Sequence, residues 1–136
     1  MACPVWNGAI TQHERMALER VQKTALAIIK GTNHTSYSDS LLEFKLETLE
    51  ARREKLCLKF ALKALKSQKF SSWFSVNQTE VNTRSEKLPL RNIKGRTKRF
   101  RTSPIPYLTE LLNAHLPKHT KEVEANIQTF VSMLEH

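Results

Sequence analysis

The residues best suited to chemistry lie in positions 84–101, where eight Lys and Arg residues stand against one acid. This stretch has a net charge of +7, whereas the whole chain of 136 residues has a net charge of +9. Guanidinium groups make planar, multi-donor contacts to phosphate, and an aromatic ring among them can stack on a base. The same composition also fits a solvated loop or a nuclear-localisation patch. We predict a nucleic-acid contact at Arg84, Lys87, Arg91, Lys94, Arg96, Lys98, Arg99, Phe100 and Arg101.

Acidic and metal-binding chemistry is sparse by comparison. Asp39 is the only Asp, and the glutamates lie among Lys and Arg as on solvated helix faces. Template-directed polymerases bind two metal ions through clustered carboxylates, and the sequence has no Asp-Asp pair. His115 and His119 have the i, i+4 spacing of two ligands on a helix, but Pro117 between them should break that helix. We therefore expect no catalytic residue, no metal site and no cofactor in this chain.

The two cysteines, Cys3 and Cys57, belong to no CxxC pair. Because no secretory signal is recognisable, we expect reduced thiols and an intracellular protein, cytoplasmic or nuclear. Cys57 falls on an apolar helix face and is expected in the core. No apolar run approaches the roughly 20 residues of a membrane span, so we expect no membrane partner.

The elements that must position the basic stretch show helical spacing. Thr11 and Glu14 form a capping-box pattern, and Gly31 supplies a stop, so a helix is predicted between them. Its apolar residues form one stripe, which consists of Leu18, Val21, Ala25, Ile28 and Ile29.

Further helices are predicted over residues 38–44, 48–66, 106–116 and 120–134, with a short extended piece near 88–93. The helix predicted over residues 48–66 has Phe60 on its apolar stripe. Beside the stripe lies a ridge of cations, which consists of Arg52, Lys55, Lys59, Lys63 and Lys66. A small aromatic cluster after it is expected to cap the core, and it consists of Phe70, Trp73 and Phe74.

Helical periodicity and only three Gly predict an all-α fold. We expect four to five helices in a small bundle-like arrangement with a long basic loop. The predicted organisation is a helical region over 1–74, a basic loop over 75–102 and a C-terminal helical pair over 103–136.

Three motifs occur in a specific order along the chain. Cys3–Asn7 (CPVWN) is followed about a dozen residues later by Leu18–Lys23 (LERVQK), and Leu46–Arg53 (LETLEARR) comes next. Ser103–Pro106 (SPIP) then precedes Leu111–Asn113 (LLN). In this order they resemble the region C-terminal to the polymerase palm in reverse transcriptases of non-long-terminal-repeat retrotransposons, jockey-like elements in particular.

The resemblance implies a full-length protein with an N-terminal endonuclease and a central RNA-directed DNA polymerase. This chain would then be the thumb end and connector, without the palm and its Asp-Asp motif, and therefore not catalytic alone. Its implied partner is template RNA or the RNA–DNA hybrid. Leu112 departs from the pattern, because the family commonly has Trp there. Trp6 is expected to be a core aromatic that anchors the first helix.

The residues leave two other functions open. One is a stand-alone basic helical module that binds nucleic acid or another protein. The other is a truncated relic with no selected function.

Overall fold

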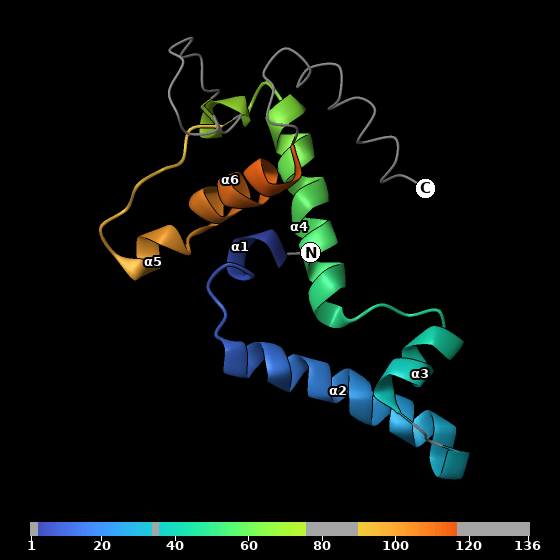
Figure 1. Ribbon diagram of the computed structural model, residues 1–136. Coiled ribbons are helices and arrows are strands. Elements are labelled where there is room, and N and C mark those ends of the chain that lie inside the picture. The colour runs from blue at the N-terminus through green and yellow to red at the C-terminus, as the bar shows by residue number, and fades with distance from the viewer. Residues whose placement is uncertain (1–2, 34–35, 76–89, 117–136) are drawn as a thin grey trace, which may run out of the picture. The chain divides into compact units, whose positions relative to one another are not determined.

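The computed structural model describes residues 3–33, 36–75 and 90–116, and these residues are mainly helical (Figure 1). The described ranges contain no β-strand, which confirms the predicted all-α fold, and the short helices α1 and α5 were not predicted. The predicted helix over 120–134 lies outside the described residues. In the described ranges, six α-helices and two 3₁₀ turns follow one another: α1 (Cys3–Trp6), α2 (Gln12–Lys30), η1 (Gly31–Asn33), α3 (Tyr37–Glu43), α4 (Leu49–Lys66), η2 (Ser71–Trp73), α5 (Lys98–Arg101) and α6 (Pro104–His115).

Both predicted ends of α2 are confirmed. The Thr11 backbone N–H donates to Glu14 Oε2 over 2.6 Å, and the Glu14 N–H donates to Thr11 Oγ1 over 3.3 Å. The hydrogen bond from the Thr11 backbone N–H, and then that from the Thr11 hydroxyl to Glu14 Oε2 over 2.9 Å, lower the pKa of Glu14. At the other end, Gly31 has a φ of 56° and its N–H donates to the Ala27 carbonyl. A positive φ of this kind is one that glycine adopts without a steric cost.

Helix α6 begins two residues before its predicted start. Ser103 precedes the helix in an extended conformation, and Pro104 and Pro106 both lie in the first turn. The first turn of a helix has no acceptors for its own N–H groups, so a proline there loses no hydrogen bond.

The chain divides into two compact units, and the boundary falls within α4. The first unit comprises Met1–Ala9 and Leu56–His136, and the second comprises Ile10–Lys55.

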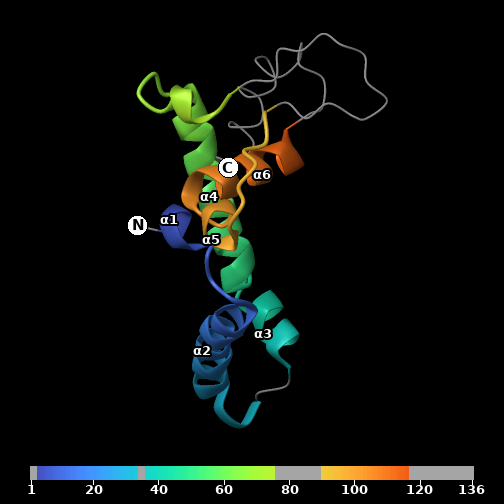
Figure 2. The same ribbon diagram turned by 90° about the vertical axis from the view of Figure 1, so that its left-hand side faces the viewer.

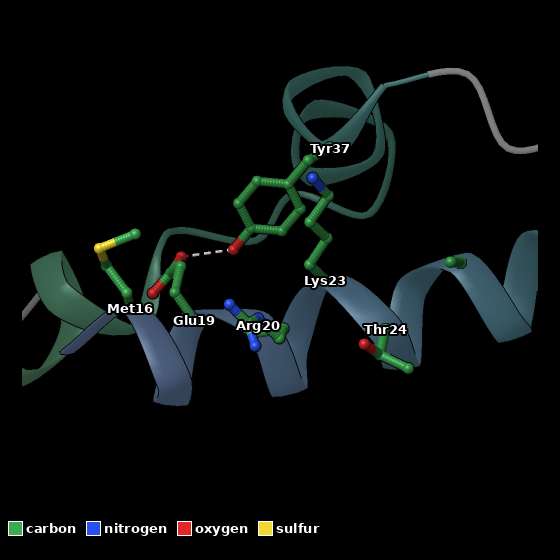
Figure 3. A pocket seen from close by; sticks show the side chains of 7 residues that line it. Met16, Glu19, Arg20, Lys23, Thr24 and Tyr37 are labelled. Atoms are coloured by element: carbon green, nitrogen blue, oxygen red, sulfur yellow. Dashed lines mark hydrogen bonds between the residues drawn. The ribbon is translucent and has the colours of Figure 1, made fainter. Parts of the chain in front are cut away.

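In the second unit, the LERVQK motif joins α2 to α3 and to the start of α4. The Glu19 carboxylate accepts a hydrogen bond from the Tyr37 hydroxyl (Figure 3). It accepts another, over 3.1 Å, from the Leu49 backbone N–H. The Gln22 side chain donates to the Glu47 carbonyl over 3.0 Å. Glu19 is therefore partly buried and connects α2 to α3 and to the start of α4. The prediction that the glutamates lie on solvated faces was wrong for this residue.

The predicted apolar stripe of α2 does not form the interior of this unit. Val21, Ile28 and Ile29 are 67%, 75% and 67% exposed, whereas Leu26 is 3% exposed. The inward face of α2 combines Leu26 with the polar contacts just described, and Lys30 adds an ion pair with Glu43 of α3 at 2.6 Å. The stripe lies on the other side of the helix, because α3 and the start of α4 cover only one face.

The core of the first unit forms around α4 and α6. Leu62, Leu108 and Leu112 are at most 1% exposed, and each such side chain stabilises the fold by about 2 kcal/mol. Helix α1 lies beside α6 in both views (Figures 1 and 2). The remaining core residues are Cys3, Cys57, Leu58, Ala61, Ala64, Phe74, Leu90, Leu111 and Leu116.

The CPVWN motif attaches α1 to this core through its first and last residues. Cys3 Sγ lies 3.6 Å from Cys57 Sγ, and Asn7 Nδ2 donates to the Tyr107 hydroxyl over 2.8 Å. The prediction that Trp6 is a core residue was wrong, because its side chain is 38% exposed. One helical turn brings positions 3 and 7 to the same face, and Trp6 lies at the edge of that face.

Tyr37 should ionise later than an ordinary tyrosine. Burial first, and then the hydrogen bond and negative charge of Glu19, raise the pKa of Tyr37 to about 12 from the ordinary 10.0. The folded state favours the neutral phenol, so this contribution to stability is complete below about pH 10 and is lost as the pH rises through about 12. We expect a delayed tyrosinate absorbance step that Tyr37→Phe removes and Tyr107→Phe retains. A delayed step that survives Tyr37→Phe would contradict this assignment.

Candidate nucleic-acid interface

Seven of the nine predicted contact residues lie in the described part of the chain, on residues 90–101, here called the basic segment. Its six cations are all exposed, and the Phe100 side chain is 45% exposed. Arg84 and Lys87 lie outside the described residues. The seven placed residues are Arg91, Lys94, Arg96, Lys98, Arg99, Phe100 and Arg101.

A buried amide fixes the beginning of the basic segment to α6. Asn113 is 8% exposed, and its Oδ1 accepts from the Leu90 N–H over 2.9 Å while its Nδ2 donates to the Leu90 carbonyl over 3.0 Å. The same Nδ2 donates to Asn92 Oδ1 over 2.9 Å. The Arg91 N–H donates to the Ser75 carbonyl over 2.8 Å. The backbone of the segment therefore starts from a fixed position on the core.

The end of the segment is ordered by the one-turn helix α5. Thr97 caps this helix, since its hydroxyl accepts from the Phe100 N–H over 3.2 Å. The Thr102 hydroxyl donates to the Lys98 carbonyl over 3.1 Å, and the Ser103 hydroxyl donates to the Phe100 carbonyl over 2.6 Å. Capping of both ends compensates for the poor intrinsic stability of so short a helix.

Phe100 is held against the backbone of its own segment. A Cβ placed on Gly95 would lie 2.2 Å from Phe100 Cδ1, far inside van der Waals contact. The ring therefore rests on the glycine, and any larger residue at position 95 would displace it. This contact orients the one aromatic ring that lies among the cations.

The cations of the basic segment have no acidic partners in the ranges 3–33, 36–75 and 90–116. Ion pairs in these ranges join Arg15, Lys30 and Lys55, which lie outside the segment, to glutamates. Like charges three or four residues apart on a helix destabilise it by a few tenths of a kcal/mol per pair. Lys98 and Arg101 have this spacing in α5, so they carry a repulsion that a bound polyanion would relieve.

Sequence reasoning found the cations but missed the residues that position them. Thr97 followed by a run without Gly or Pro was a signal for α5, but four residues are too few for a helical period. Asn113 belongs to the LLN motif, but nothing in the sequence indicates that Leu90 is its partner. The predicted extended piece near 88–93 agrees with the non-helical backbone of residues 90–93, and residues 88–89 are outside the description.

The other candidate chemical groups have structural roles where they are described. The Asp39 carboxylate accepts from the Ser36 hydroxyl over 2.7 Å at the start of α3. His115 Nδ1 lies 2.9 Å from the Leu111 carbonyl, and His119 is outside the described residues. The described residues contain no group of three or more His, Cys, Asp or Glu that could hold a metal ion. No described helix is both long enough and apolar enough to cross a bilayer.

Comparison with known proteins finds no match for this chain among protein-family models, curated proteins or solved structures. The resemblance to retrotransposon reverse transcriptases thus stays a prediction from the motifs.

Replacing Asn113 should destabilise the first unit by more than the loss of one hydrogen bond, because its side chain bonds to both backbone groups of Leu90. Asn113→Ala leaves the Leu90 N–H and carbonyl without these hydrogen bonds in a buried position, at about 1–3 kcal/mol per group. We expect the free energy of unfolding, measured with urea, to fall by about 2–6 kcal/mol. The control Asn92→Ala removes one bond from an exposed residue and should cost about 1 kcal/mol or less. Equal losses in the two variants would contradict the proposed attachment.

Proposed function

We propose that this chain binds nucleic acid through the basic segment, as a non-catalytic part of a retrotransposon reverse transcriptase. In that role it follows the polymerase palm and holds template RNA and the RNA–DNA hybrid. The family assignment rests on the order of the motifs, and the binding assignment rests on the physical properties of the segment.

One observation carries the binding proposal. Six exposed cations without acidic partners in the described ranges lie on a backbone that is attached at one end by Asn113 and capped at the other by Thr102 and Ser103. Cations on a fixed backbone lose less conformational entropy when they bind phosphates than cations on a free chain. The segment therefore combines positive charge with an ordered backbone. A loop whose charges only keep the protein in solution does not need an ordered backbone.

The exposed apolar stripe of α2 favours a second candidate, a protein-interaction module. Val21, Ile28 and Ile29 expose large side chains that a partner protein could bury. This function places the partner on α2 and assigns no role to the basic segment. Salt-dependent nucleic-acid binding that depends on the basic segment separates the two candidates.

The salt dependence of binding should follow the arginines of the basic segment. If four cations of the basic segment contact phosphates, the logarithm of the affinity for RNA or RNA–DNA hybrid should fall with the logarithm of the salt concentration at a slope of about −3 to −4. Changing Arg96, Arg99 and Arg101 to Ala removes three of these contacts. We expect the slope to shrink to about −1 and the affinity at moderate salt to fall at least about tenfold, as measured by fluorescence anisotropy.

The cation ridge of α4 offers a control with the same change of charge. Arg52, Lys59 and Lys63 are exposed, and changing all three to Ala should leave the slope nearly unchanged. An equal loss in both triple variants would mean that binding follows net charge alone. Unchanged affinity in the arginine variant would overturn the assignment to the basic segment.

A further inference from the structure

An apolar pocket of about 380 Å³ lies in the first unit beside the basic segment. Its walls come from α1, α4, η2, the basic segment and α6, and they include Val5, Phe60, Trp73, Ile93, Phe100 and Ile105. Among the lining side chains, only Ser103 and the indole of Trp73 contain a polar atom. The Ser103 hydroxyl already donates to the Phe100 carbonyl over 2.6 Å. The pocket thus offers an occupant apolar surface and almost no hydrogen bonds.

Three aromatic rings of this pocket remain partly accessible. Phe60 and Phe100 are 39% and 45% exposed, and Trp73 is partly buried. The Phe70 ring lies 4.8 Å from the Trp73 ring at an interplanar angle of 54°, and Phe100 rests on Gly95. Phe60, which the sequence assigns to the apolar stripe of its helix, is thus only partly covered. Trp73 and Phe100 are thus held in place by Phe70 and Gly95, and part of each pocket ring remains accessible to a ligand.

Cations flank the aromatic wall of the pocket. Lys98, Arg99 and Arg101 are within two residues of Phe100, and Lys94 follows Ile93. Successive Cα atoms are about 3.8 Å apart, so the Cα atoms of these cations lie within about 8 Å of that of Phe100 or Ile93. An occupant should therefore combine a flat apolar group with closely spaced negative charges.

We propose that this pocket takes an unpaired base of a single-stranded nucleic acid, while the adjacent phosphates contact the cations of the basic segment. This inference rests on the proposed nucleic-acid binding. A single strand presents base faces and phosphates together, whereas a duplex hides its base faces inside the stack. Because the pocket has almost no free donors or acceptors, it stacks a base without reading its identity, and binding should tolerate changes of sequence.

The experiment compares four probes with the full chain at one salt concentration. They are a mixed-sequence single-stranded RNA, the duplex of the same length, an abasic strand with the same number of phosphates, and an acidic peptide with one Phe. We expect the single strand to bind about 5- to 150-fold more tightly than the abasic strand or the duplex. Phe100→Leu should reduce the affinity for the single strand toward that for the abasic strand and leave the latter unchanged.

Phe44→Leu is the matched control, because Phe44 is 39% exposed and lies in the second unit. It should leave all four affinities unchanged. Equal affinity for single strand, duplex and abasic strand would overturn the base pocket and leave the proposed function standing. Absence of binding to all three nucleic acids would overturn the proposed function itself. Tightest binding of the acidic peptide, lost in Phe100→Leu, would assign the pocket to a protein partner instead.

Discussion

The attachment of Leu90 to the buried side chain of Asn113 is the constraint on which the candidate interface depends. The Asn113 amide satisfies both the N–H and the carbonyl of Leu90, as a neighbouring backbone would in a sheet. Leu90 is only 1% exposed, so its backbone groups need these partners. Because the bonds run from a side chain of α6 to a segment that precedes α5, they set where six cations emerge from the core. Without this attachment, the cations would belong to a chain that must be ordered at the moment of binding.

The same device recurs at the other motifs of the chain. Glu19 and Gln22 bond to the backbone of Leu49 and Glu47, and Asn7 bonds to Tyr107. Small units bury little apolar surface, and their segments gain definite positions from polar side chains that bond across them. The motif residues that suggested a family are thus mainly joints between segments. The nucleic-acid contact that we propose lies elsewhere, on the basic segment.

Local features were predictable from the sequence to the extent that their causes are local. The capping box at Thr11 and the stop at Gly31 fix α2 through neighbouring atoms, and both were visible as residue types. The exposed position of Trp6 and the outward direction of the α2 stripe depend on which face meets a partner. A stripe such as Val21, Ile28 and Ile29 shows that a face is apolar, but it does not show what covers that face. The pairing of Leu90 with Asn113 was unpredictable for the same reason, because 23 positions separate the two residues.

The central claim is that nucleic acid contacts the chain along the basic segment, and photo-crosslinking tests it most directly. Single-stranded RNA that contains a photoreactive uridine would be crosslinked to the chain, and the modified residues would be located by mass spectrometry. Crosslinks should concentrate between Arg91 and Arg101, with Phe100 prominent among them, and should fade as salt is raised. Crosslinks confined to α2, or scattered over all exposed cations without enrichment in residues 91–101, would contradict the account.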